Sequence, residues 1–453
     1  MTNTGYTPEE PICAPATPLV PSAIGIVRAS GKNCIELASK FFSRKNALLE
    51  AKGNTLVYGW IKDGDEKIDE VMAGVYRSPK SFTGEDMIEI FCHGGINIVK
   101  SILDVFLKNG FRKAERGEFT FRAYINGKAD LTKAEAVREI IESKTSVSRS
   151  RASGRLAGNL FSEIDAIKKL VIDSLAAIEV EIEYPEDEEN ISDTFDSSKL
   201  LEAEKKLSIL KDSWKSEKLY QEGAKIVLCG KTNAGKSSLF NALLKEDRAI
   251  VSETEGTTRD WLESTADFDG IPVRLFDTAG IRETSDKIEE QGVQLAKDLS
   301  CEADVILYLI DSEKGLSDDD KSFIQSRTDI PLIKVYTKSD VYKKEAEENA
   351  VCVSAKTEEG IPLLIQKIKS VLEKGESVSR ETAGLGSERQ KESVSAALER
   401  IQHALHVAES AELGLDAVVQ DLEDALDFLG EVTGSVTPDD ILSSVFANFC
   451  VGK

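Results

Sequence analysis

The sequence predicts an α/β and α protein with three parts. These are an N-terminal α+β domain, a helical-bundle domain split in two along the chain, and an inserted α/β domain with a mostly parallel sheet. The chain has 453 residues, which is too many for one hydrophobic core, so two to four domains are expected. The periodicity of apolar residues changes along the chain from strand-like to helical, then to alternating strands and helices. A second helical stretch follows, so the two helical stretches can pack as one bundle around the insertion.

The composition indicates a globular protein that does not enter a membrane. Hydrophobic residues make up 41% of the chain and charged residues 30%, and no uninterrupted apolar run could span a bilayer. The N-terminal stretch "MTNTGYTPEEPICAPATP" has no basic flank followed by an apolar stretch, which excludes a secretory signal. Its prolines predict a frayed end. Seven scattered cysteines, an odd number, favour reduced thiols in the cytoplasm.

The net charge of −23 bears on possible partners. Proteins that grip nucleic acid usually carry a basic patch that replaces phosphate counterions, and this chain has no long basic run. If the protein acts on RNA, a more basic partner should make much of the contact. Solubility alone explains the acidity equally well.

The first domain is expected over residues 1–125. Short strand-like runs ("AIGIVRAS", "TLVYGWI", "EVMAGVY" and "DMIEIFC") are mixed there with one helical stretch near "GINIVKSILDVFLKNG". That mixture is typical of an α+β domain.

The first part of the helical domain is expected over residues 126–222 and the second over 377–453. Apolar residues recur at steps of three and four in both. In the first part they are Leu156, Leu160, Ile164, Ile167, Val171, Leu175, Ile178 and Ile182; in the second, Val394, Ala397, Ile401, Leu405 and Ala408. The acidic run "EYPEDEEN" ends the first helix. A solvated loop explains that run better than a metal site.

The inserted α/β domain is expected over residues 223–376. Its strand candidates are "KIVLC", "PVRLFD", "ADVILYLID", "PLIKVYT" and "AVCVSA", with helical stretches between them. After it, "GESVSRETAGLGSE" has the composition of a linker.

The stretch "GKTNAGKS" fits the phosphate-loop pattern G-x-x-x-x-G-K-[ST]. Gly230 and Gly235 allow a tight backbone whose N–H groups face a β-phosphate. Lys236 supplies a charge to the β/γ oxygens, and the Ser237 hydroxyl can ligate Mg²⁺. The motif follows a strand and precedes a helical stretch, as its function requires. A purely structural glycine-rich turn is a remote alternative.

Three downstream motifs select guanine over adenine. "DTAG" begins at Asp277, whose carboxylate suits the Mg²⁺ site, and "TKSD" ends at Asp340, which can accept both N–H groups of guanine's edge. "SAK" begins at Ser354 and could contact the base oxygen. Four motifs in this order resemble the GTPase family of P-loop proteins.

Two positions depart from the usual GTPase pattern. Thr337 replaces the usual asparagine of the base motif, which predicts a weaker guanine contact without altered specificity, because Asp340 remains. Ile281 follows "DTAG" where a glutamine often orients water, so another residue must do this.

The stretch "VSETEGTTRD", together with Asn233, resembles the TrmE-type subfamily of GTPases. The resemblance implies that Thr258 ligates Mg²⁺ beside Ser237 and that a K⁺ ion takes the place of an arginine finger. The implied K⁺ ligands are Asn233, Ser252, Thr254 and Thr257. A cation at the developing β/γ charge stabilises the transition state whether it is Arg or a metal. The implied water-orienting acid is Glu289, whose alternative role is a solvated helix-surface acid.

The GTP-binding residues that these motifs predict lie in four stretches. They are Asn233, Ala234, Gly235, Lys236, Ser237 and Ser238; Ser252, Glu253, Thr254, Glu255, Gly256, Thr257 and Thr258; Asp277, Thr278, Ala279 and Gly280; and Thr337, Lys338, Asp340, Ser354, Ala355 and Lys356.

The C-terminal residues "FANFCVGK" end in C-x-G-K. A C-a-a-X lipidation signal fits poorly because of Gly452 and the basic last residue, and a structural cysteine is a further alternative. With the N-terminal matches "GIVRASG", "SFTGEDMIEI", "HGG", "RGEFTFRAYINGKADL" and "KAEAV", the whole chain resembles the MnmE family of tRNA modification GTPases. The resemblance implies an N-terminal folate-binding and dimerisation domain. Family folate contacts fall on Arg28, Glu85, Lys128 and Lys453, and Cys450 becomes a candidate nucleophile.

The resemblance implies a function beyond GTP hydrolysis with Mg²⁺ and K⁺. The protein would form a homodimer, and a heterotetramer with the FAD-dependent partner MnmG. Together they would install an aminomethyl or 5-carboxymethylaminomethyl group at C5 of the wobble uridine of certain tRNAs. The carbon would come from a tetrahydrofolate, in its 5,10-methylene or 5-formyl form. Two alternatives stay open: a ribosome-assembly GTPase switch without modification chemistry, and a folate-binding scaffold whose GTPase signals metabolic state.

Overall fold

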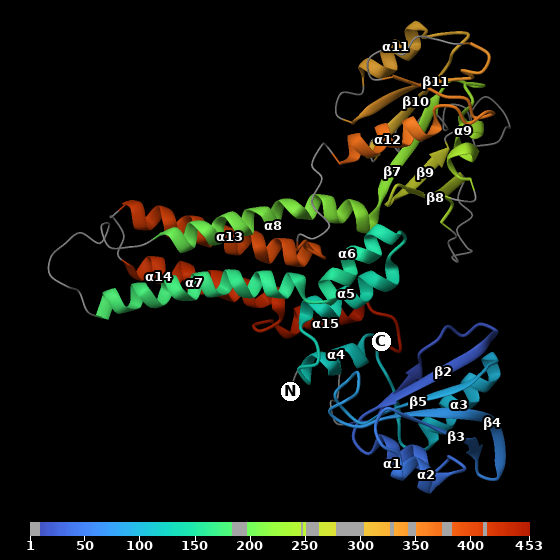
Figure 1. The fold of residues 1–453 in the computed structure, drawn as a ribbon, viewed down its shortest axis with the longest axis vertical. Helices are drawn as coiled ribbons and strands as arrows, with labels where there is room; N and C mark the ends of the chain where they lie inside the picture. The colour runs from blue at the N-terminus through green and yellow to red at the C-terminus, as the bar shows by residue number, and fades with distance from the viewer. Residues whose placement is uncertain are drawn as a thin grey trace. The chain divides into compact units, whose positions relative to one another are not determined.

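The computed structural model describes residues 10–183, 197–245, 248–250, 262–277, 303–326, 330–342, 350–373, 383–410 and 415–453. The chain divides into two compact units, coloured along the sequence in Figure 1. Unit 1 comprises residues 1–138, 156–207 and 392–453, and unit 2 comprises residues 139–155 and 208–391. Within the described ranges, no helix is both long and apolar enough to cross a bilayer.

Unit 1 contains a six-stranded sheet in the order β3-β4-β5-β2-β1-β6. Its strands are β1 (Ile12–Pro15), β2 (Ser22–Ser30), β3 (Thr55–Asp63), β4 (Glu66–Tyr76), β5 (Met87–Gly94) and β6 (Arg112–Lys113). The four long strands pair antiparallel, while β6 joins β1 in parallel. Four of the six strands coincide with runs expected from alternating hydrophobicity.

Helices cover one face of this sheet. Helices α1 (Cys34–Ser39), α2 (Lys45–Glu50) and α3 (Ile96–Lys108) contribute Ile35, Leu48 and Phe106 to a core with the inward residues of the strands. Side chains alternate across a strand, so every second residue points to the opposite face. That second face, here called the open face, carries Arg28 of β2 and Glu89 of β5.

The expectation of a frayed N-terminus is wrong for residues 12–15. They form β1, which pairs with β2 on one side and β6 on the other, and Ile12 and Cys13 are fully buried. Pro15 is tolerated because it is the last residue of this short strand.

The helices that follow form the remainder of unit 1 and the first segment of unit 2. They are α4 (Glu118–Ile125), α5 (Leu131–Glu142), α6 (Ser146–Leu156), α7 (Asn159–Glu183) and α8 (Ser198–Glu222), with α13 (Glu388–Ser410), α14 (Leu415–Thr433) and α15 (Asp439–Ala447) from the end of the chain.

In unit 1, segments far apart in sequence pack as one bundle. Helix α7 packs on α14, and buried Ile164 and Leu422 represent the two apolar faces. The predicted union of the two helical stretches is therefore confirmed. Leu156 was wrongly assigned to this face: it is the last residue of α6 and 38% exposed, because Gly158, at φ 99°, turns the chain before α7 begins.

Unit 2 contains a second six-stranded sheet in the order β12-β11-β10-β7-β9-β8. Its strands are β7 (Ala224–Gly230), β8 (Leu262–Phe268), β9 (Ile271–Asp277), β10 (Val305–Asp311), β11 (Leu332–Thr337) and β12 (Ala350–Cys352). All neighbours pair in parallel except β8 and β9, so the sheet is mostly parallel as predicted. Strand β8, an antiparallel edge strand, was not expected.

Helices lie on both faces of the second sheet. Helices α9 (Lys236–Leu243) and α12 (Ile361–Leu372) pack on one face through Leu239 and Leu364. Helix α11 (Asp318–Gln325) packs on the other through Phe323, which stacks on Tyr308 of β10. In such open sheets the loops after the carboxyl ends of the strands build the ligand site.

Candidate functional site: a phosphate loop and a docked C-terminal tail

The loop between β7 and α9 has the backbone that phosphate binding needs. Gly230 has φ 141°, and a Cβ there would lie 2.5 Å from the carbonyl oxygen of Leu309, so only glycine fits. Asn233 and Gly235 take left-handed conformations at φ 63° and 86°. Gly235 is the N-cap of α9, whose N-terminus favours negative charge.

The cation and the hydroxyl of the motif both contact groups in or beside the loop. The Lys236 ammonium donates to the carbonyl oxygens of Gly230 and Lys231, at 2.7 and 2.9 Å, so it closes the loop. Burial lowers the pKa of Lys236, and the Asp277 carboxylate partly offsets this. The Ser237 hydroxyl donates to Asp277 at 2.8 Å, which brings together two groups of the predicted Mg²⁺ site.

The base motifs also meet after folding. The Ser354 hydroxyl, fully buried, donates to the Asp340 carboxylate at 2.8 Å, although Asp340 itself is exposed. Lys338 pairs with Asp311 at 2.7 Å, and that hydrogen bond lowers the pKa of Asp311. Asp340 is thus held with its carboxylate toward solvent, where a base could reach it.

The remaining predicted GTP residues divide into two groups. Ala234 is buried, Asn233, Ser238 and Lys356 are exposed, and Ala355 is half-buried, all in the loops just described. The others lie outside the described residues: Ser252, Glu253, Thr254, Glu255, Gly256, Thr257, Thr258, Thr278, Ala279, Gly280 and Glu289. Their roles as K⁺ ligands, Mg²⁺ ligand and water-orienting acid stay predictions.

A second cluster, which includes residues predicted to bind folate, lies in unit 1 on the open face. Arg28 of β2 faces Glu89 of β5 across the antiparallel ladder and pairs with it at 2.8 Å. The Arg28 guanidinium also donates to the carbonyl oxygen of Gly452 at 3.2 Å and lies 5.4 Å from the Phe82 ring. Tyr76 donates to the second Glu89 oxygen at 3.1 Å.

The C-terminal tail, residues 450–453, is docked at this cluster. Gly452 has φ 93°, and a Cβ there would lie 2.3 Å from the carbonyl oxygen of Pro15, so the tail fits closely against β1. The Phe119 N–H donates to the Lys453 carbonyl at 3.2 Å, and Cys450 remains exposed. Burial, followed by the nearby charge of Arg28, lowers the pKa of Lys453.

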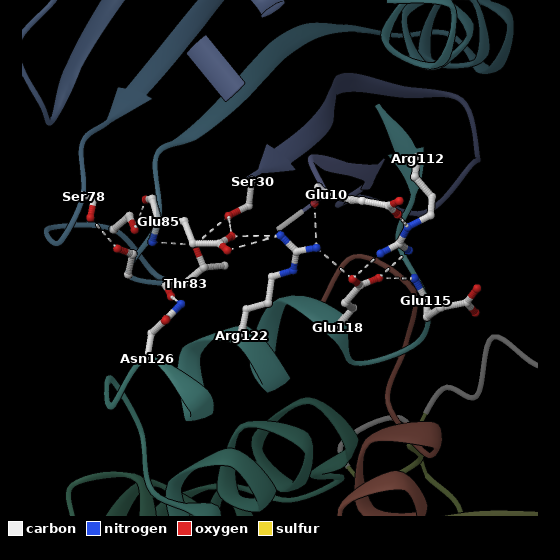
Figure 2. Close-up of polar contacts among 12 residues, drawn as sticks. Glu10, Ser30, Ser78, Thr83, Glu85, Arg112, Glu115, Glu118, Arg122 and Asn126 are labelled. Atoms are coloured by element: carbon white, nitrogen blue, oxygen red, sulfur yellow. Dashed lines mark hydrogen bonds and ion pairs between the residues drawn. The ribbon is translucent and has the colours of Figure 1, made fainter. Parts of the chain in front are cut away.

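Glu85 and Lys128 border the loop that carries Phe82. Glu85 accepts from the Ser30 hydroxyl at 2.8 Å and from Arg122 at 3.0 Å, as Figure 2 shows. Lys128 donates to the Pro79 carbonyl at 3.0 Å. Ser30 is two residues after Arg28, so both side chains lie on one face of β2. The structure therefore gathers Arg28, Glu85, Lys128 and Lys453 around one strand and one loop.

Glu89, Ser30 and Arg122 belong to this cluster and were not predicted from the sequence. Arg122 is 1% exposed and also pairs with the buried Glu118 at 3.0 Å. The run "DMIEIFC" predicted a strand that contains Glu89, but strand register, which pairs Glu89 with Arg28, is not visible in a sequence.

Two family models match the chain. One, described as the GTP-binding protein TrmE N-terminus, matches residues 11–128. The other, described as the MnmE helical domain, matches residues 131–450, which is more than half of the chain. The protein belongs to the MnmE family.

Relatives of nearly equal length carry the same family name. The tRNA modification GTPase MnmE of Treponema denticola is 51% identical over 99% of both chains. Those of Treponema pallidum and Borrelia turicatae are 41% and 42% identical over 99% and 98% of both chains. The protein is therefore a tRNA modification GTPase, and the loop at Lys236 stays its predicted GTP site.

Proposed function

We propose that this MnmE-family protein hydrolyses GTP with Mg²⁺ and K⁺ in the cytoplasm and, with the FAD-dependent MnmG, modifies C5 of the wobble uridine of certain tRNAs. The group added is of the aminomethyl or 5-carboxymethylaminomethyl type. The observation that carries the proposal is the docking of the C-x-G-K tail, residues 450–453, beside Arg28 of the N-terminal sheet. A GTPase that acted only as a binding switch would have no need of a thiol held at such a cluster.

The nucleotide site supports the Mg²⁺ part of the proposal. Ser237 and Asp277 are already hydrogen-bonded at 2.8 Å, and both offer the oxygen atoms that Mg²⁺ prefers. Asn233 is exposed in a left-handed conformation at the tip of the loop, so its amide oxygen is free to reach a K⁺ ion near the phosphates.

The Arg28 cluster fits a tetrahydrofolate. In the described part of the chain the Lys453 ammonium makes no ion pair. Burial, followed by the nearby charge of Arg28, lowers its pKa, so the charged form is held at a cost. An anion would relieve that cost, and folate carries carboxylates on its glutamate tail. The Glu85 carboxylate, 19% exposed, keeps acceptor capacity toward pterin N–H groups beside Arg122. When bound, the folate supplies the one-carbon unit.

The exposure of Cys450 supports a role of its thiol on the tRNA base. Its thiol is exposed at the end of the tail, and thiolate formation would make it a nucleophile for the uridine ring. Gly452 and Lys453 fix the tail, because the former packs on Pro15 and the latter accepts from Phe119.

The open face of the unit 1 sheet supports homodimerisation. Tyr58, Met72, Phe91 and Ile26 form one cross-strand row, and Tyr58 and Met72 are 47% and 36% exposed. A row of large apolar side chains on one sheet face is typical of an interface between subunits. We propose that a second copy covers it, next to the Arg28 cluster.

The first experiment compares tRNA modification by Cys450→Ser and Val451→Ser proteins with MnmG, tetrahydrofolate, GTP and a tRNA substrate. Cys450→Ser should abolish wobble-uridine modification while GTP hydrolysis stays within about twofold, because the thiol belongs to unit 1 and the phosphate loop to unit 2. Val451→Ser, a change at an exposed neighbour in the same tail, should retain both. Full modification by Cys450→Ser would refute the nucleophile role.

A second experiment tests the K⁺ part of the proposal. GTP hydrolysis in KCl should exceed that in NaCl at equal ionic strength, and Asn233→Ala should remove the difference. Equal rates in both salts would refute the K⁺ assignment and favour the ribosome-assembly switch, which predicts rRNA association and no folate binding.

A further inference from the structure

Thr337, at the end of β11, uses its side chain on the phosphate loop. The residue is 5% exposed, and its Oγ1 lies 2.8 Å from the carbonyl oxygen of Ala234. The carbonyl oxygen of Ile310 in β10 is 3.3 Å away. Thr337 stands where GTPases usually have an asparagine, so these contacts bear on how the base is recognised.

The chemistry of a hydroxyl limits what Thr337 can do. It carries one hydrogen, and both of its neighbours are carbonyl oxygens that only accept. That hydrogen is therefore committed to the backbone. Guanine presents two acceptors, N7 and O6, on its major-groove edge. The Thr337 hydroxyl has no hydrogen left for that edge, whereas an asparagine amide would have two.

The surroundings of Thr337 connect the phosphate loop to the sheet. A Cβ added at Gly235 would have the Thr337 side chain as its nearest neighbour, at 3.7 Å, so this side chain faces that glycine of the loop. The main chain of Thr337 is held in turn by β10, because the Ser312 N–H donates to its carbonyl at 3.2 Å. The phosphate loop is thus joined through Thr337 to the strand that leads directly to Asp340.

We propose that Thr337 is a positioning residue that ties the phosphate loop to the base-recognition strand. Guanine is then recognised at its Watson–Crick edge by Asp340, with no hydrogen bond at N7. This inference rests on the binding of guanine at Asp340.

The test measures the dissociation constants of GDP and 7-deaza-GDP for the full-length protein by competition. The analogue replaces N7 with a C–H group and leaves the Watson–Crick edge unchanged. The unsubstituted protein should bind both within about twofold, whereas Thr337→Asn should prefer GDP by about tenfold through a new hydrogen bond to N7. A preference for GDP of fivefold or more in the unsubstituted protein would overturn the proposal.

Two further variants test the positioning role. Thr337→Val keeps the shape but leaves the Ala234 carbonyl unpaired, so both nucleotides should bind about tenfold more weakly with their ratio unchanged. Thr337→Ser, which restores the hydroxyl, should recover most of this loss. Unchanged nucleotide affinity in Thr337→Val would overturn the positioning role of Thr337. If Thr337→Val does not fold, the nucleotide affinities of Thr337→Ser and Thr337→Asn decide the test. Failure of the unsubstituted protein to bind GDP would instead refute guanine binding itself.

Discussion

The phosphate loop of unit 2 and the Arg28 cluster of unit 1 are built in opposite ways. The loop takes its cation, its hydroxyl and its special backbone from the single stretch between Gly230 and Ser237. The cluster joins Arg28 to the carbonyl of Gly452, 424 positions later. A loop of consecutive residues carries its own cation and hydroxyl, although Asp277 and Thr337 from later strands still contact it. A cluster assembled across the chain depends on the packing of every element that carries one of its members.

The largest expected effect is the loss of GTP hydrolysis in Lys236→Ala. Removing the one cation that closes the loop should lower kcat/KM for GTP by at least about 100-fold, because transition-state charge loses its partner. Lys321→Ala, which changes an exposed lysine of α11, should stay within about twofold. Retention of a tenth of the activity by Lys236→Ala would contradict a dominant local role for the loop.

A distant change should disturb the Arg28 cluster and leave the loop alone. Glu118 is fully buried between Arg112 and Arg122, at 2.7 and 3.0 Å. Glu118→Gln should destabilise α4 by about 3 kcal/mol, since the buried Arg122 and the partly exposed Arg112 lose their shared carboxylate. Hydrogen exchange of the α4 amides measures this, with the exposed Glu115→Gln as control and GTP hydrolysis unchanged in both. Equal protection of the α4 amides from hydrogen exchange in Glu118→Gln and in the unsubstituted protein would refute this prediction.

The pH dependence of α4 follows from the same carboxylate. Burial raises the pKa of Glu118, but the hydrogen bonds from Arg112 and from the Glu115 N–H lower it by more, so the net shift is downward. A carboxyl with a depressed pKa stabilises the fold above its ordinary value, near 4.5, and that contribution is lost as pH falls below it. Protection of α4 should therefore fall below pH 4.5 in the unsubstituted protein and change less in Glu118→Gln.

A smaller effect is expected where the tail meets β1. Gly452→Ala places a Cβ against the Pro15 carbonyl and should lower tRNA modification about tenfold, with GTP hydrolysis unchanged. Gly64→Ala is the matched control, because Gly64 is also left-handed, at φ 61°, yet a Cβ there would meet nothing within 4 Å. Faster release of the tail residues by carboxypeptidase in Gly452→Ala would confirm undocking. Equal modification by both variants would refute it.

The smallest effect belongs to a single hydrogen bond in the base loop. Ser354→Ala removes the hydroxyl that holds Asp340 and should weaken GDP binding about fivefold. Ser326→Ala, at the exposed end of α11, should leave the affinity unchanged. A weakening of 100-fold or more would mean that the base loop depends on distant packing as strongly as the Arg28 cluster does.

Local patterns in the sequence predicted most of the fold. Alternation along β3 and β4, and the continuous apolar runs of β7 and β10, were sufficient to place those strands. Strand β1 was missed because it is four residues long and ends in Pro15. Its stability comes from pairing with β2 and with the distant β6. Strand β8 was missed because "LESTADF" is largely polar and lies at an edge of the sheet.

The phosphate loop could be predicted further from the sequence than the Arg28 cluster, because only the loop has a geometry set by neighbouring residues. The motif around Lys236 specifies its own backbone, so its geometry could be predicted from residue types. The Arg28–Glu89 pair depends on the register of β2 against β5, and the burial of Arg122 depends on where α4 packs. Neither has a local sequence signal, and only the family resemblance directed attention to Arg28, Glu85 and Lys453.

The contact between Arg28 and Gly452 has a consequence for the order in which the protein is made. The ribosome adds Ser354, in the last of the predicted GTP-binding stretches, well before it adds the tail that contacts Arg28. The tail follows roughly 100 residues later, which takes about 5–20 s at 5–20 residues per second. During that interval a nascent chain can already hold a nucleotide while its Arg28 cluster is incomplete. Synthesis thus separates the completion of the two sites in time, because unit 2 is complete at residue 391, before the tail is made.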